Sequence, residues 1–245
     1  MSSLPIADDN PITLIRFQVV TVCLIAVNVV VFGGQSLLDD QSTWELWASF
    51  GVIPVVLNDE MSLPPDLDVI PAWATLLTSM FLHSGIYHLG GNMLFLWIFG
   101  DNVEDAMGHT RFLLFFVACG VLAGLTQAFV DPDSLAPVIG ASGAIAGVLG
   151  AYLMLHPRRR MIVLVLRMIP IRLHVGLVLI FWGLFQVGSA FVLNGDPDND
   201  TAWWAYIGGF IAGMVLVVVF KRWSVPLFDM DLVSEKKDKK ERVSY

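Results

Sequence analysis

The sequence predicts an all-α, polytopic membrane protein with six transmembrane helices. Apolar residues make up 56% of its 245 residues and charged residues only 15%, and the mean hydropathy is +0.71. A soluble domain could not bury that much apolar surface. Crossing the hydrocarbon core takes about 20 apolar residues. The runs of suitable length lie at residues 14–34, 76–99, 111–130, 136–155, 173–194 and 203–220.

The distribution of basic residues supports this count and predicts the topology, because Lys and Arg concentrate on the cytoplasmic side of membrane proteins. All 14 Lys and Arg lie before or at the first run, between runs two and three, between runs four and five, or after run six. The alternate loops are acidic. We therefore expect both termini to be cytoplasmic. The domains are a short, disordered N-terminal lead (1–13), a six-span membrane domain (14–222) and a charged cytoplasmic tail (223–245).

Charge and cysteine content narrow the class further. The net charge of −8 at pH 7 comes mostly from the external loops and argues against nucleic-acid binding. Cys23 and Cys119 fall inside apolar runs, which predicts buried thiols and no disulfide framework. The first run has no small-residue cleavage site after it, so it is interpreted as a retained anchor. Short loops without large appendages favour a prokaryotic plasma membrane.

The fourth run carries the first candidate for chemistry. Gly143, Gly147 and Gly150 recur at intervals of four and three residues, so they share one helical face that another helix can approach closely. Ser142 lies at the edge of this face with little bulk around its hydroxyl, as a nucleophile requires. The alternative is a small packing residue, which is the usual role of a lone serine in a membrane helix.

The second run contains His83, His88 and Asn92, polar groups that indicate a functional site when they occur inside a membrane. His88 and Asn92 are four residues apart and share a helical face, where both can donate hydrogen bonds to a developing oxyanion. On a continuous helix His83 would diverge from His88 by more than about 100°. This divergence, together with the lack of deep Cys, Asp or Glu in another run, predicts no metal site. Hydrogen bonding to neighbouring helices is the alternative, and it is stronger for His83.

Tyr206 is the only titratable group in the sixth run. It precedes Gly209 by three residues and Gly213 by seven, so the three share one face. If that face packs against the glycine face of the fourth run, Tyr206 points towards Ser142.

Three further segments are interpreted from composition. The 35–75 loop combines tryptophans with acids and prolines, which is typical of a partly inserted interfacial structure. It is either an aromatic anchor or an element that steers substrate. Glu104 and Arg111 are expected to pair across a turn at Gly108. Residues 161–172 are expected to lie along the inner membrane surface.

These residues together resemble the rhomboid family of intramembrane serine proteases, over nearly the whole chain. The matching pattern is His88-x-x-x-Asn92, then Glu104, Gly108 and Arg111, then Gly140-Ala-Ser142-Gly143, and finally Ala205-x-Ile-Gly-Gly with Gly213. The resemblance implies a rhomboid-like bundle around a water-filled cavity open to the outside. It assigns Ser142 as nucleophile, with its backbone amide, His88 and Asn92 as the oxyanion site. It also implies single-span membrane proteins as substrates, admitted past the fifth run and the long first loop, and no cofactor.

The chain departs from the family at the general base. Family members have a histidine directly before the Ile-Gly-Gly, where this chain has Tyr206. A serine hydroxyl needs a base that is unprotonated at working pH, and only about one tyrosine in a thousand is phenolate at pH 7. Loss of one member of a serine–histidine unit removes about 10⁴ to 10⁶ of the rate. Rescue by His83 or His88 is an alternative, and Tyr206 could fill the volume of the aromatic that the family often has where this chain has Ala146.

Two functions remain from the sequence. The first is a rhomboid-type intramembrane serine endopeptidase, impaired by Tyr206. The second is a catalytically inactive pseudoprotease that binds transmembrane clients. The chemistry favours the second and the family resemblance favours the first. A small-solute transporter has less support, because no inverted repeats are evident and the polar interior residues gather near one surface.

Overall fold

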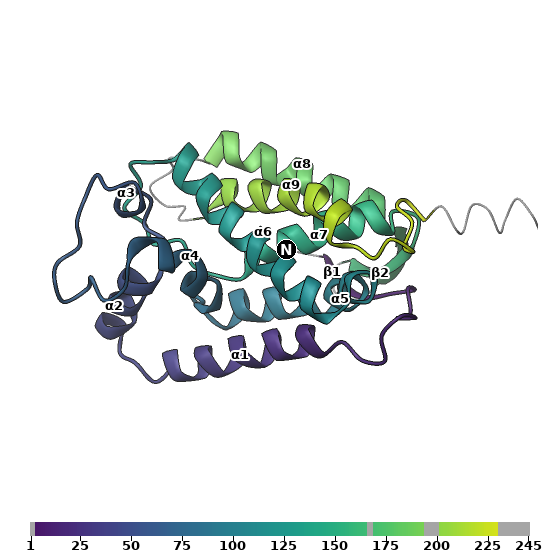
Figure 1. The fold of residues 1–245 in the computed structure, drawn as a ribbon, viewed down its shortest axis with the longest axis horizontal. Helices are drawn as coiled ribbons and strands as arrows, with labels where there is room; N and C mark the ends of the chain where they lie inside the picture. Colours follow the sequence, from purple (N-terminus) through teal and green to yellow (C-terminus); the bar gives the residue numbers. More distant parts are fainter. Residues whose placement is uncertain (1–2, 166–168, 194–200, 230–245) are drawn as a thin grey trace, which may run out of the picture.

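The structure is a computed structural model that describes residues 3–165, 169–193 and 201–229. Arg167, the acidic residues of the 195–200 stretch and most of the expected tail lie outside these residues. Helices dominate the fold (Figure 1). The long helices are α1 (Val19–Gln35), α5 (Ile86–Met107), α6 (His109–Val130), α7 (Ser142–Leu155), α8 (Val175–Leu193) and α9 (Trp203–Phe220).

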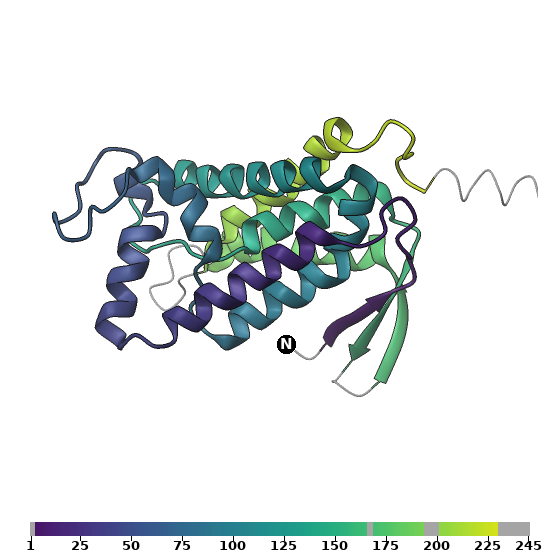
Figure 2. The same ribbon diagram turned by 60° about the horizontal axis from the view of Figure 1, so that its bottom comes forward.

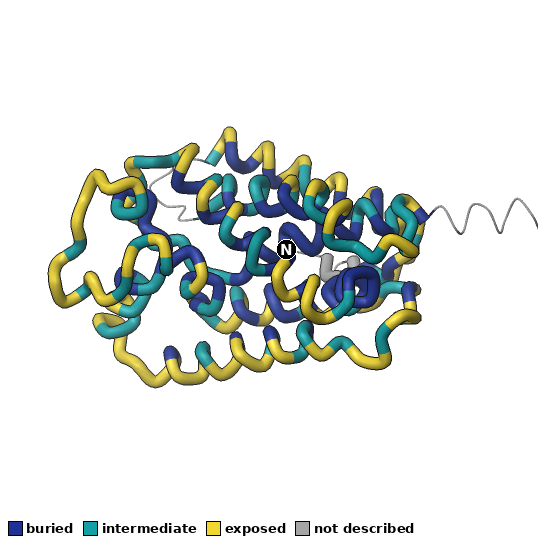
Figure 3. The backbone as a smooth tube through the Cα atoms, viewed as in Figure 1, coloured by how far each residue is buried: buried dark blue, intermediate teal, exposed yellow. Residues whose placement is uncertain are grey.

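The mostly helical membrane class is confirmed, whereas the full count of six spans is not. α6, α8 and α9 are long and apolar enough to cross a membrane, by length and composition, and α1 and α7 are shorter apolar helices. Much of α8 is exposed (Figure 3), and its exposed residues include large apolar ones, as expected for contact with lipid hydrocarbon. Among them are Leu177, Phe181, Leu184 and Phe191.

Two predicted runs are divided, because backbone breaks that apolarity does not reveal lie inside them. In the second run, α4 (Thr75–Thr78) and η2 (Ser79–Phe81) precede a short extended stretch, and α5 begins only at Ile86. In the fourth run, residues 136–141 are not helical, and Val138 forms a β-bridge with Val52. Gly140 has φ +116°, a conformation that favours glycine. The chain turns there, so α7 begins at Ser142.

The glycine faces of α7 and α9 pack against each other with backbone in contact. A Cβ atom on Gly209 would lie 2.0 Å from the carbonyl oxygen of Gly143, and one on Gly213 would lie 1.9 Å from that of Gly147. Only glycine permits so close an approach. Large buried side chains, including Phe99, Phe115 and Tyr152, fill the core beside this seam.

The elements of the 35–75 loop gather at one end of the bundle, at the far end from the strands (Figures 1 and 2). They include α2 (Asp40–Phe50), α3 (Pro54–Leu57) and η1 (Ala72–Ala74). The Asp39 side chain accepts a hydrogen bond from the Ser42 N–H at the start of α2. This bond lowers the pKa of the Asp39 carboxyl.

A small antiparallel sheet at the other end corrects one expectation. β1 (Ser3–Asp8) pairs with β2 (Arg160–Val165), which pairs with β3 (Ile169–His174), in the order β1-β2-β3 (Figure 2). The N-terminal lead was expected to be disordered, but residues 3–8 form a strand, because β2 and β3 pair with each other and offer an edge to a third strand. The position of the 161–172 segment along the inner membrane surface stays a prediction.

The predicted pairing of Glu104 with Arg111 is also wrong. Glu104 is fully buried, and its carboxylate accepts hydrogen bonds from the N–H groups of Val20 and Thr21 in the first turn of α1. It also lies 2.5 Å from Nδ1 of His109. A carboxylate is favoured at a helix N-terminus, so Glu104 fastens α1 to α5.

Candidate active site

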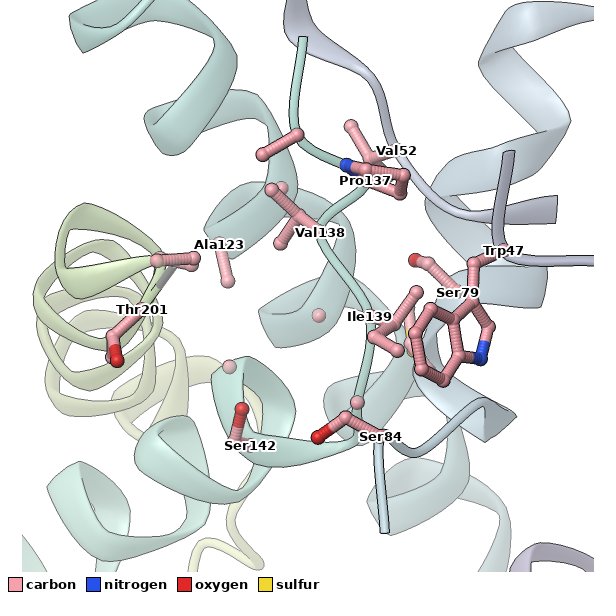
Figure 4. Close-up of a pocket in the computed structure, with 18 of the residues that line it drawn as sticks. Trp47, Val52, Ser79, Ser84, Ala123, Pro137, Val138, Ile139, Ser142 and Thr201 are labelled. Carbon is pink, nitrogen blue, oxygen red and sulfur yellow. The ribbon is translucent and has the colours of Figure 1, made fainter. Parts of the chain in front are cut away.

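A cavity of about 580 Å³ opens between the start of α5, the start of α7 and the start of α9. Its walls also come from α2, α6 and the extended 136–140 stretch. Figure 4 shows Ser142 and Ser84 at its base, with Trp47 and Ser79 to one side and Thr201 to the other. Ser142, His88 and Tyr206 all line this cavity.

The first residue of α7 is Ser142, so its side chain stands at the helix N-terminus. Its hydroxyl lies close enough to interact with the hydroxyl of Tyr206 on α9, and both residues line the cavity. The spacing argument placed these two side chains together across the glycine seam, and the structure brings them into contact.

His88 approaches the same place from α5. Its Nε2 atom lies 2.7 Å from the position that a Cβ on Gly140 would take, and Oγ of Ser142 lies 3.5 Å from that position. A side chain at residue 140 would therefore fill the space between the imidazole and the serine. Nδ1 of His88 faces Ser84 instead, at 3.1 Å from the hydroxyl and 3.4 Å from the backbone N. Nε2 is buried and has no hydrogen-bond partner within the described residues.

Asn92 is held away from this cavity and does not line it. Its Nδ2 atom lies 2.9 Å from Nε2 of His83. His83 precedes the break at Gly85 and is not part of α5, so the divergence expected on a continuous helix does not apply. The rings of His83 and His88 instead meet edge to face, with centroids 5.0 Å apart.

Tyr206 also borders a second cavity of about 290 Å³ between α8 and α9. Trp182, Ile180 and Phe210 are among its mostly apolar lining residues. The Tyr206 ring lies edge to face with the indole of Trp203, at 6.1 Å between centroids. Tyr206 therefore lies between the Ser142 cavity and this second, mostly apolar cavity.

Sequence reasoning did not identify Ser84 and Gln35. The side chain of Gln35, the last residue of α1, bonds both the carbonyl and the N–H of His83. Ser84 then bonds His88. The one sequence signal for this contact was that Ser84 lies four residues before His88. That spacing indicates a hydrogen bond only once residues 82–85 are known to precede the helix. In the described part of the chain, no three His, Cys, Asp or Glu side chains lie close enough to hold a metal ion.

The fold and the cavity define a helical membrane protein with a serine at a helix N-terminus, in a cavity that a histidine and a tyrosine also line. The rhomboid domain family matches residues 71–223, and the chain belongs to this family.

The chain is also similar to individual rhomboid proteins. It is 36% identical to rhomboid protease GluP of Bacillus subtilis (strain 168) over 144 residues, which are 59% of this chain and 26% of that protein. It is 29% identical to Rhomboid-like protein 11, chloroplastic, of Arabidopsis thaliana over 166 residues, 66% of this chain and 58% of that protein. It is 36% identical to putative rhomboid protease YdcA of Bacillus subtilis (strain 168) over 81 residues, 33% of this chain and 40% of that protein. The chain therefore spans between about a quarter and three fifths of the length of these relatives.

Proposed function

We propose that this protein binds transmembrane segments of single-span membrane proteins at the Ser142 cavity, and that Tyr206 suppresses hydrolysis there. The observation that supports this proposal is the proximity of the Ser142 and Tyr206 hydroxyls in the lining of one cavity. Rhomboid-type intramembrane function follows from membership of the family. Our proposal is more specific: the protein binds its clients without cleaving them. We place the protein in a prokaryotic plasma membrane, with both termini in the cytoplasm.

The chemistry at residue 206 carries the argument. Acyl transfer needs a group that takes the serine proton during attack and returns it to the leaving amine. A neutral phenol in contact with Ser142 holds its own proton and exchanges hydrogen bonds with the serine. It therefore occupies the position of a base without accepting the proton at neutral pH.

The remaining parts of a hydrolytic site support intramembrane serine proteolysis as a second candidate. Ser142 stands at the N-terminus of α7, where backbone N–H groups favour developing negative charge. His88 faces the same space with an unpartnered Nε2 among the described atoms. Asn92 has a second amide N–H besides the one directed to His83, but it does not line the cavity. In this reading Ser142 is the nucleophile, and Tyr206 occupies the place of the general base.

Replacing Tyr206 with histidine separates the two functions. The purified natural chain and Tyr206→His are reconstituted in lipid vesicles with a single-span model substrate, and cleavage is followed by gel electrophoresis. We expect cleavage in Tyr206→His at least about 10³-fold above the natural chain, because a base is restored. The Tyr206→His/Ser142→Ala double variant is the control and should be inactive.

Tyr206→Phe provides a second control, since it keeps the ring and removes the hydroxyl. It should stay inactive. Equal cleavage by the natural chain and Tyr206→His would contradict the assignment of residue 206 and favour the protease. Client binding is measured separately by photocrosslinking of the same substrate to Ser142→Ala, which should retain it.

A further inference from the structure

The loop before α5 fixes the orientation of the His88 imidazole through a single residue. Ser84 lies against Nδ1 of His88 with two groups, its hydroxyl at 3.1 Å and its backbone N at 3.4 Å. A backbone N–H can only donate a hydrogen bond, so Nδ1 must offer a lone pair. In a neutral imidazole the proton then resides on Nε2.

Nε2 is the atom of His88 that faces the Ser142 cavity. It is buried, without a partner in the described part of the chain, and close to the Gly140 backbone beside Ser142. With its proton on Nε2, His88 presents a hydrogen-bond donor to whatever enters the space between these residues. It cannot at the same time act as a base through that atom.

The neighbouring histidine has the opposite arrangement. The amide Nδ2 of Asn92 can only donate, so Nε2 of His83, 2.9 Å away, accepts and the His83 proton resides on Nδ1. Asn92 does not line the cavity, whereas His88 does, so His88 is the one of these groups whose ring nitrogen faces it.

The position of Ser84 is itself secured by α1. Gln35 is buried and bonds both backbone groups of His83, the residue directly before Ser84. This support comes from outside the 71–223 region that matches the family. Hydrogen bonds through Gln35, His83 and Ser84 therefore link the end of α1 to the His88 imidazole.

We propose that Ser84 is a positioning residue that sets the tautomer of His88, so that a protonated Nε2 is aimed beside Ser142 as a donor for a carbonyl oxygen or oxyanion of a bound segment. The proposal rests on the proposed function and deepens it, because it assigns to Ser84 the control of the donor that the family resemblance places at His88. It also excludes rescue of the missing base by His88.

The tautomer is measured directly, without any client. The full chain is labelled with ¹⁵N-histidine in detergent micelles, and long-range ¹H–¹⁵N spectra distinguish protonated from unprotonated ring nitrogens. His88→Asn identifies the His88 signals. In the natural chain we expect Nε2 of His88 to be protonated and Nδ1 to be unprotonated.

Variants of Ser84 test the cause. Ser84→Ala removes the hydroxyl and keeps the backbone N–H, the group that requires a lone pair on Nδ1. We expect Nε2 of His88 to stay protonated in this variant, with a changed ¹⁵N shift at Nδ1 because one hydrogen bond to that atom is lost. Ser84→Thr keeps the hydroxyl and should restore the natural shift. Ser79→Ala removes another hydroxyl of the same cavity that does not contact His88, and should leave the His88 signals unchanged.

A His88 that carries its proton on Nδ1 in the natural chain would overturn the proposal, and so would signals that do not change in Ser84→Ala. The functional readout uses the Tyr206→His background, where Ser84→Ala should lower kcat and leave KM nearly unchanged. If Tyr206→His does not cleave, the proposed function fails, whereas the tautomer measurement still tests Ser84.

Discussion

Replacing Gly213 with alanine tests whether the α7–α9 seam determines stability. The added Cβ would lie 1.9 Å from the carbonyl oxygen of Gly147, and 2.5 Å and 2.6 Å from its C and Cα atoms. Ordinary contact begins at 3.4 Å, so the two helices must separate by about 1.5 Å. Overpacking typically costs about 1 to 3 kcal/mol. The upper part of that range applies here, because the obstructing atoms are backbone and cannot rotate away.

The matched control is Gly188→Ala on α8, where a Cβ would meet nothing within 4 Å. It should be neutral, or stabilising by up to about 1 kcal/mol through helix propensity. Unfolding is followed by tryptophan fluorescence during titration of mixed micelles with sodium dodecyl sulfate, and free energies of unfolding are compared. A Gly213→Ala protein within about 0.5 kcal/mol of the natural chain would refute the account of the seam.

Two further changes test the end of the bundle that carries the sheet. Glu104→Gln replaces the carboxylate that faces the N–H donors of α1 and His109 with an amide, and we expect the free energy of unfolding to fall by about 2 kcal/mol in the same titration. Glu45→Gln, at an exposed position, is the control and should have no effect. Equal free energies of unfolding for the two variants would contradict the capping role of Glu104. Burial raises the pKa of the Asp8 carboxyl above its ordinary 3.8, so its contribution to stability is fully present below pH 3.8 and is lost as pH rises through the higher folded-state pKa. Asp8→Asn, which keeps an acceptor for the Tyr152 hydroxyl, should therefore be more stable than the natural chain at pH 7, with a flatter pH dependence, and an unchanged pH profile would refute this.

The helices were predictable from the sequence where composition alone determines them. The sixth run coincides with α9 (Trp203–Phe220), because an apolar run with no internal break has no alternative to helix in a membrane. The spacing of glycines also predicted that Ser142 and Tyr206 meet, since helical periodicity places them on facing surfaces.

The breaks were not predictable in the same way. The stretch 136–141 is as apolar as the helix that follows, and only the pairing of Val138 with Val52 and the φ of Gly140 interrupt it. His83 was placed on a helix for the same reason, so its contacts with Asn92 and Gln35 could not be foreseen. The roles of Ser142, His88, Asn92 and Tyr206 stay predictions.

The sheet depends on contacts between segments that are distant in the chain. The apolar β-branched run of β2 could have indicated a strand, but its pairing with β1 is not encoded locally. Glu104 likewise bonds backbone N–H groups at the N-terminus of α1, and not Arg111, which is nearer in the sequence. Two backbone donors, those of Val20 and Thr21, face its carboxylate there.

The β1–β2 pairing has a consequence for biosynthesis. At the end of these two strands the backbone N–H of Arg160 donates a hydrogen bond to the side chain of Asp9, 151 positions away in the chain. The helices α1, α5, α6 and α7 all lie between these two residues. Residues 3–8 must therefore wait, without a partner, while those helices are synthesised and inserted. We conclude that β1 pairs with β2 late in assembly, after the helices up to α7 have been inserted.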